Sequence, residues 1–198
     1  MSIKTQERTT TLVKPVTRDS IWRLSTRAVV YMAIGAALYA VLNLITNGWV
    51  IPGAQNVSVR PSIVIPIFFG VLFGPIVGFF TGFIGNLLSD QLSYSIYWNW
   101  EIGNGLVGLI AGFTALFVRG AYRRWPNVVA AALFSAAGII VGLGVAAITD
   151  QWLYSKISFK AAVTTEWIPA VGSDLLFGIP LLVILLAAWS RARERASR

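Results

Sequence analysis

The sequence contains no cysteine and no histidine among its 198 residues. Their absence excludes disulfide bonds, thiolate nucleophiles, zinc sites built from Cys and His, and imidazole general bases. A phosphate-binding loop of the form GxxxxGK[ST] is also missing, since none of the lysines follows a glycine. We therefore expect neither a metal site nor a cofactor, and no ATP-hydrolysing machinery in this chain.

Charged residues are scarce as well. They make up 12% of the chain, whereas hydrophobic residues make up 56% and the mean hydropathy is +0.70. A soluble domain usually has about twice that share of charge, so lipid is the natural solvent for this chain. The net charge of +8 would otherwise suggest nucleic acid, but no basic RNA- or DNA-binding motif is present and no nucleic-acid partner is expected.

Long apolar runs predict an all-α integral membrane protein with six transmembrane helices in a compact bundle. A bilayer needs about 20 apolar residues per helix. The continuous run 61–88 is too long for one upright helix, and Pro favours the first position of a helix. We divide this run at Gly74-Pro75, the alternative being one long helix kinked at the proline. The predicted helices cover residues 28–46, 61–73, 75–90, 102–118, 127–149 and 168–189.

The distribution of basic residues predicts the orientation, because cytoplasmic segments are enriched in Lys and Arg. Six spans place both ends on one side, and 13 of the 16 basic residues then share that side. The prediction divides the chain into a cytoplasmic tail (1–27), a six-helix transmembrane domain (28–190) and a basic cytoplasmic tail (191–198). These 13 residues are Lys4, Arg8, Lys14, Arg18, Arg23, Arg27, Arg119, Arg123, Arg124, Arg191, Arg193, Arg195 and Arg198.

The opposite side has three longer connections, near 47–60, 90–101 and 150–167, which hold five of the eight tryptophans. Tryptophan belts at the membrane interface explain part of this excess. The run from Tyr94 to Glu101, which includes Trp98, Asn99 and Trp100, is denser than a belt requires. Flat aromatic surfaces beside amide and carboxylate groups are typical of a pocket for a small polar aromatic ligand. Both interpretations stay open.

Polar side chains inside or near the spans are costly and therefore informative. Asn86 and Asp90 are four apart and share a helix face, as do Glu101 and Asn104, three apart. Asp174 lies inside the last helix, about 9 Å from its outer end at 1.5 Å per residue. These residues and Arg60, which precedes Pro61, are predicted to converge in the outer half of the membrane domain. They form either a binding cavity or a charge-paired network of Arg60 with Asp90 or Asp174, and the two are compatible.

Carboxylates in one cavity are compatible with acid–base chemistry, but no nucleophile–base pair or cofactor motif accompanies them. An enzyme is therefore not expected.

Small residues recur at spacings of four. Ala33 and Ala37, overlapped by Ala36 and Ala40, place small side chains on the first helix, where another helix can approach closely. That neighbour is either a partner protein or another helix of the same bundle. Gly70, Gly74, Gly78 and Gly82 repeat at the same spacing, and with a turn at Gly74 they predict that turn and two packing contacts.

The stretch from Arg60 to Asn86, with Leu-Phe-Gly-Pro-x-x-Gly at its centre, resembles helices two and three of the S components of energy-coupling factor (ECF) transporters. S components capture vitamins for this class of transporter. Length, six helices and the missing ATPase match the same family over about 28–190.

The resemblance implies a multi-pass protein of a prokaryotic cell membrane. It would bind a water-soluble vitamin from outside and dock on a T component that carries two ATP-binding subunits. Ala33, Ala37 and Ala40 would contact the T component. By position the ligand site would use Trp98, Asn99, Trp100, Asn104 and Asp174. A heteroaromatic or corrinoid vitamin (riboflavin, thiamine, a folate or a corrinoid) is expected, and a stand-alone secondary transporter or channel is the alternative.

Overall fold

The computed structural model describes residues 22, 24–46, 48–54, 57–93, 95–118 and 122–196. Several residues of the orientation argument lie outside these ranges, as does Tyr94: Lys4, Arg8, Lys14, Arg18, Arg23, Arg119 and Arg198. The regular secondary structure of the described part is helical apart from one isolated antiparallel bridge between Val50 and Ser58. The helical elements are α1 (Thr26–Thr46), η1 (Pro61–Ile63), α2 (Val64–Phe73), α3 (Pro75–Ser93), α4 (Trp98–Gly112), α5 (Thr114–Phe117), α6 (Trp125–Leu153), α7 (Phe159–Ala161), η2 (Ala162–Trp167) and α8 (Ile168–Ala196).

The predicted all-α membrane fold with six main helices is confirmed. Four described segments are long and apolar enough to cross a membrane: Thr26–Thr46, Trp98–Phe117, Trp125–Leu153 and Phe159–Ala196. The segment Pro61–Phe73 is a shorter apolar helix, and α3 packs against it.

The chain turns at Gly74, as the sequence indicated. Gly74 has φ of 103°, a conformation that side-chain-bearing residues rarely adopt, and its N–H donates to the carbonyl of Gly70 at 2.8 Å, closing α2. Pro75 then begins α3, where its missing N–H costs no helical hydrogen bond. The interpretation as one long kinked helix was wrong, because the backbone leaves the helical conformation at Gly74, between the end of α2 and the start of α3.

The last helices are longer than predicted. Helix α6 begins at Trp125-Pro126, and α8 is preceded by α7 and by η2, a π-helical stretch. The sequence 159–167 contains polar residues and was predicted as a loop. The structure makes it helical, continuous with α8 to Ala196, so the C-terminal basic segment extends the last helix rather than leaving it at 190.

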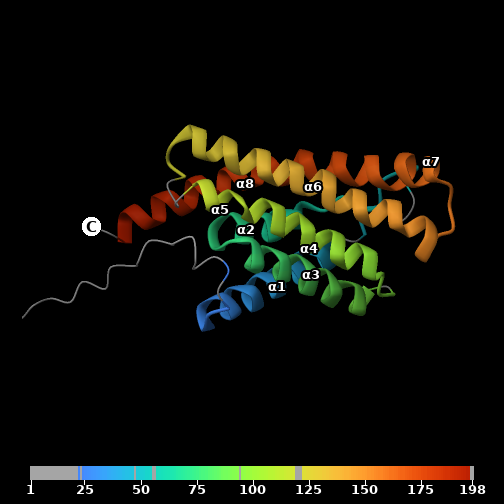
Figure 1. Ribbon diagram of the computed structural model, residues 1–198, viewed down its shortest axis with the longest axis horizontal. Helices are drawn as coiled ribbons and strands as arrows, with labels where there is room; N and C mark the ends of the chain where they lie inside the picture. The colour runs from blue at the N-terminus through green and yellow to red at the C-terminus, as the bar shows by residue number, and fades with distance from the viewer. Residues whose placement is uncertain are drawn as a thin grey trace, which may run out of the picture.

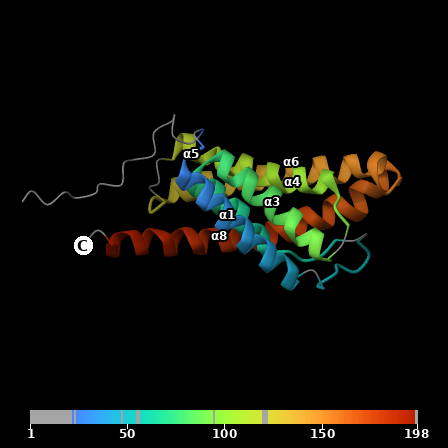
Figure 2. The ribbon, with the colours of Figure 1, turned by 90° about the horizontal axis from the view of Figure 1, so that it is seen from below.

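Helix α4 occupies the centre of the bundle and packs against α2, α3 and α6. Figure 1 shows α6 and α8 along one face, with α1 and α3 on the other and α4 between. Seen from below in Figure 2, α1 and α3 form the near layer and α6 lies behind α4. This order places the first turns of α4 between the ends of α3, α6 and α1.

The start of α1 and the end of α8 lie at the same end of the bundle (Figure 1). The connection between α5 and α6 lies there too, since Arg123 Nη1 and Glu194 Oε1 form an ion pair at 2.6 Å. Trp22 also contacts Phe113 at this end, with 6.3 Å between ring centroids. We call this the basic end, and the connections α1–α2, α3–α4 and α6–α7 form the loop end.

Close backbone contacts of glycines hold α2, α3 and α4 together. A Cβ at Gly78 would stand 2.1 Å from the carbonyl oxygen of Gly108, and one at Gly70 would stand 2.3 Å from the same atom. A Cβ at Gly82 would stand 2.1 Å from the oxygen of Asn104. The glycine series therefore makes one turn and three packing contacts, one more than predicted, because α4 faces both halves of the α2–α3 turn.

Candidate functional site

An ion pair at the loop end connects the start of α2 to α8. Nη2 of Arg60 lies 2.9 Å from Oδ2 of Asp174, and Nη1 lies 3.5 Å from Oδ1 of Asn104 on α4. The hydroxyl of Tyr39, on α1, donates to the same Asn104 oxygen at 2.8 Å. Four residues from four segments thus form one buried network.

Arg60 reaches this position because the residue before a proline is held out of the helical region. It has φ −123° and ψ 76° and directly precedes Pro61 at the start of η1. Its exposed fraction is 9%. Burial opposes the charge of Arg60 and the carboxylate of Asp174 favours it, and the balance raises the pKa of the guanidinium above its ordinary value. Arg60 is therefore a fixed positive charge.

A second network lies beside the first. Nδ2 of Asn86 donates to Oε2 of Glu101 at 2.8 Å and to Oδ2 of Asp90 at 3.2 Å. Nδ2 of Asn43 donates to Oδ1 of Asn86 at 3.4 Å, and the hydroxyl of Ser62 donates to Oδ1 of Asn43 at 3.2 Å. Two carboxylates from α3 and α4 therefore meet on a single amide group.

We call the two networks together the polar layer. Its members come from α1, the segment 60–62, α3, α4 and α8, and all except Asp90 are buried. Three of its polar atoms have no hydrogen-bond partner within the described chain: Nε of Arg60, Oε1 of Glu101 and Oδ1 of Asp174. Buried polar atoms are normally paired, so these three atoms are the unsatisfied groups of the layer. The layer consists of Tyr39, Asn43, Arg60, Ser62, Asn86, Asp90, Glu101, Asn104 and Asp174.

The tryptophan-rich segment divides into three environments. Trp98 is 51% exposed, with its ring stacked on Phe83 at 6.4 Å. Asn99 is buried, but its amide donates to the carbonyl of Ala146 and to Oδ1 of Asp150, both at 2.9 Å, and not to the polar layer. Trp100 is partly buried against the core, and its carbonyl accepts from Asn104 Nδ2 at 2.8 Å. Trp100 thus contacts the polar layer through its backbone carbonyl.

The small residues of α1 separate onto two faces. Gly35, Ala36 and Ala40 are buried, the last with an exposed fraction of 6%. Ala33 and Ala37 are exposed. Ala40 is thus not available to a partner, since α1 packs against α3 and α2 on that side. Packing within the bundle accounts for the buried face, and docking of a partner on the face of Ala33 and Ala37 stays a prediction.

Comparison with known proteins identifies the family. The model of the family described as "ECF-type riboflavin transporter, S component" matches residues 23–191. The chain is an S component of this family.

Relatives of the S component support a single family over nearly the whole chain. It is 35% identical to a UPF0397 protein of Photobacterium profundum over 176 residues, which cover 86% of this chain and 94% of the relative. A UPF0397 protein of Vibrio vulnificus is 34% identical, with 86% and 95% covered. The predicted resemblance is confirmed. The S component is thus a multi-pass subunit of a transporter in a prokaryotic membrane, and not an enzyme.

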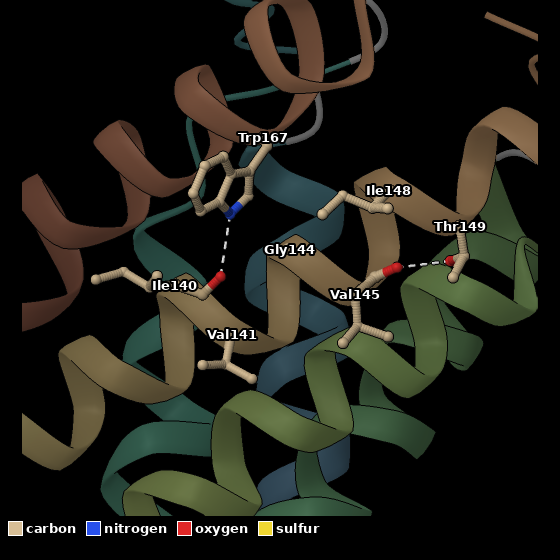
Figure 3. Close-up of a pocket in the computed structure, with 7 residues that line it drawn as sticks. All are labelled: Ile140, Val141, Gly144, Val145, Ile148, Thr149 and Trp167. Atoms are coloured by element: carbon tan, nitrogen blue, oxygen red, sulfur yellow. Dashed lines mark hydrogen bonds between the residues drawn. The ribbon is translucent and has the colours of Figure 1, made fainter. Parts of the chain in front are cut away.

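An apolar groove lies on the surface of the S component (Figure 3), and none of its described lining residues belongs to the polar layer. Its volume is about 420 Å³, and its lining comes from α6 and Trp167. The indole Nε1 of Trp167 donates to the carbonyl of Ile140 at 3.0 Å, and the hydroxyl of Thr149 donates to the carbonyl of Val145 at 2.6 Å. Both polar groups are already hydrogen-bonded, so the described lining of the groove is mainly apolar.

Three residues of the polar layer were missed in the sequence: Tyr39, Asn43 and Ser62. A signal for two of them was present, because Tyr39 and Asn43 are four apart and share the face of Ala36 and Ala40 on α1. Asn43 is a polar residue flanked by the apolar residues Leu42 and Leu44. Ser62 had no such signal, since a serine beside a proline is ordinary in loops.

Proposed function

We propose that this S component captures a water-soluble heteroaromatic vitamin at the polar layer. The observation that supports this proposal is that polar side chains from five segments meet at one end of the bundle, where they are buried and partly without hydrogen-bond partners. Binding sites in membrane helices are built from such costly polar residues. Trp100, whose backbone carbonyl accepts from Nδ2 of Asn104 at 2.8 Å, is proposed to supply an aromatic surface for a planar ring system.

The family description names riboflavin, which is therefore the first ligand to test. Riboflavin, thiamine, folate and a corrinoid are compared by titration into the purified chain in detergent, following tryptophan fluorescence. At least one of them is expected to quench the fluorescence and bind below the micromolar range. Asn104→Ala should weaken that binding, and Phe117→Ala, at the basic end, serves as the control. Binding of all four only above the micromolar range would contradict the proposal.

Delivery requires partners, because the sequence has no phosphate-binding loop. We propose that a T component carrying two ATP-binding subunits docks on the exposed face of α1 at Ala33 and Ala37. Small exposed side chains let a second helix approach closely, and bulky apolar residues surround them: Val29, Val30, Ile34, Leu38 and Val41. The face is thus both smooth at its centre and apolar at its rim.

The basic end is proposed to face the cytoplasm, following the positive-inside rule. The polar layer then lies near the external surface, which suits capture from outside. The rival function is a stand-alone secondary transporter. Reconstitution in liposomes separates the two: vitamin uptake is expected only when the T component, the ATP-binding subunits and ATP are present. Uptake by the chain alone would favour the rival.

A further inference from the structure

The apolar groove of Figure 3 lies between two membrane-spanning segments. Its lining runs along α6 from Ile140 to Thr149 and is completed by Trp167 of η2. Both sides of the groove belong to segments that are long and apolar enough to cross a membrane, Trp125–Leu153 and Phe159–Ala196. An occupant of the groove would therefore come from the hydrocarbon region of the bilayer or from another membrane helix.

The dimensions of the groove favour a single hydrocarbon chain over a helix. Residues 140–149 advance about 14 Å along the axis of α6 at 1.5 Å per residue. The volume of about 420 Å³ divided by this length gives a mean cross-section of about 30 Å². A helix with its side chains is about 10 Å across, or about 80 Å² in section, so it would lie over the groove without entering it. An extended acyl chain carries no side chains and is narrow enough to enter.

The described lining offers no free polar side chain to an occupant. The indole Nε1 of Trp167 already donates to the carbonyl of Ile140, and the hydroxyl of Thr149 donates to the carbonyl of Val145. A polar ligand would lose its hydrogen bonds to water here without replacing them, which is unfavourable. A hydrocarbon chain has no such bonds to lose.

Two lysines lie at the loop end of the groove. Lys156 is in the α6–α7 connection, seven residues after Thr149, and Lys160 is in α7, seven residues before Trp167. Figure 1 shows the end of α6 and α7 at the same end of the bundle. Both lysines are exposed, and the salt bridges of the described chain are formed by other residues. The groove thus has unpaired positive charge at one end.

The sequence sets these two lysines apart from the other basic residues. Of the 16 Lys and Arg residues, the three in or beside the connections of the loop end are Arg60, Lys156 and Lys160, and Arg60 is buried in its ion pair. Exposed aromatic residues accompany the lysines: Trp152, Tyr154 and Phe159. Aromatic residues of this kind mark the headgroup level of a membrane. The lysine charges therefore lie at the level of lipid phosphates, and the groove extends from there toward the hydrocarbon.

We propose that an anionic phospholipid binds at this place, with one acyl chain in the groove and its phosphate at Lys156 and Lys160. The apolar lining, the narrow cross-section and the unpaired charge at headgroup level each match one part of such a lipid. An anionic headgroup is attracted to each lysine near the membrane surface, whereas a zwitterionic headgroup carries no net charge. The site shares no described residue with the polar layer, so the proposal does not depend on vitamin capture.

The first test locates the lipid. Binding of phosphatidylglycerol and of phosphatidylcholine with identical acyl chains is measured on the purified full-length chain in detergent by native mass spectrometry. Val141→Trp fills the groove from an exposed position and is expected to remove one bound lipid. Leu133→Trp is the matched control, because Leu133 is an exposed apolar residue of α6 outside the described lining, and it should remove none.

The second test examines the headgroup of the lipid that Val141→Trp removes. Phosphatidylglycerol is expected to bind there at least about tenfold more tightly than phosphatidylcholine, because two lysines attract its charge. The double variant Lys156→Gln/Lys160→Gln should remove that preference. Arg193→Gln/Arg195→Gln removes the same amount of charge from exposed positions at the basic end and should retain the preference.

Equal affinity of the two lipids for the groove would overturn the proposal, as would an unchanged preference in the double lysine variant. Retention of every bound lipid by Val141→Trp would place the lipids elsewhere and overturn it too. A dimer of the purified chain that Val141→Trp dissociates would assign the groove to a second copy of the chain instead. Should Val141→Trp fail to fold, Val145→Trp repeats the test from another exposed position of the same lining.

Discussion

Arg60 and Asp174 form a buried ion pair, with 2.9 Å between Nη2 and Oδ2, although 114 residues separate them in the chain. The pair joins the start of α2 to the second turn of α8, at the end of the bundle where the longer connections lie. It fixes the position of the segment that precedes α2, and through Asn104 it is connected to α4 and α1.

Asp174→Ala should therefore destabilise the protein. It leaves the guanidinium of Arg60 buried without its counter-charge, which typically costs about 3–5 kcal/mol. The measurement is the midpoint of unfolding in detergent. The double variant Arg60→Gln/Asp174→Asn is the control and should lose less, because no unpaired charge remains. Wild-type stability of Asp174→Ala would show that the pair contributes nothing to the fold.

The contact between Gly78 and Gly108 should tolerate no side chain. A Cβ at Gly78 would lie 2.1 Å from a backbone oxygen of α4, so α3 and α4 must separate, and overpacking of this kind costs about 1–3 kcal/mol or more. Gly78→Ala is compared with Gly172→Ala in α8, where a Cβ meets nothing within 4 Å. The control should be neutral or stabilised by up to about 1 kcal/mol, since Ala favours a helix interior. Equal effects of the two substitutions would argue against close packing of α3 on α4.

The proposed orientation can be measured directly, because the chain has no cysteine of its own. Lys160→Cys at the loop end should react with a membrane-impermeant maleimide added to intact cells. Arg124→Cys at the basic end should react only after permeabilisation. Both positions are exposed, so accessibility to the reagent depends on sidedness. The reverse pattern would place the basic end outside and contradict the positive-inside assignment.

The exposed face of α1 should separate binding from transport. Ala33→Trp and Ala37→Trp add bulk to an exposed surface of α1, so vitamin affinity and unfolding midpoint should stay near wild type. Uptake by the complex with the T component and its ATP-binding subunits should be lost, together with co-purification of the T component. Ala40→Trp is the contrasting variant: this residue is buried, so the change should lower stability. Normal uptake by Ala33→Trp and Ala37→Trp would move the docking surface elsewhere.

The sequence predicted those parts of the fold that depend on neighbouring residues in the chain. Apolar length predicted the spans, and Gly74-Pro75 predicted the break between α2 and α3, because glycine permits φ of 103° and proline begins a helix. The helical form of 159–167 was missed, since its polar residues resemble a loop. Its helix is stabilised by packing of η2 against α6 and α8, which no local pattern reveals.

Within the candidate site, the sequence determined which residues carry charge in an apolar chain, and the scarcity of charge made Arg60, Asp90, Glu101 and Asp174 conspicuous. Only the tertiary structure decided their partners: Asp174 rather than Asp90 for Arg60, and one shared amide for Asp90 and Glu101. It also separated Asn99 from the polar layer and Ala40 from the exposed face of α1. The reason is physical: residue type and spacing fix what a side chain can do and which face of its own helix it lies on, whereas its neighbours depend on how the helices are rotated and packed, which long-range contacts alone determine.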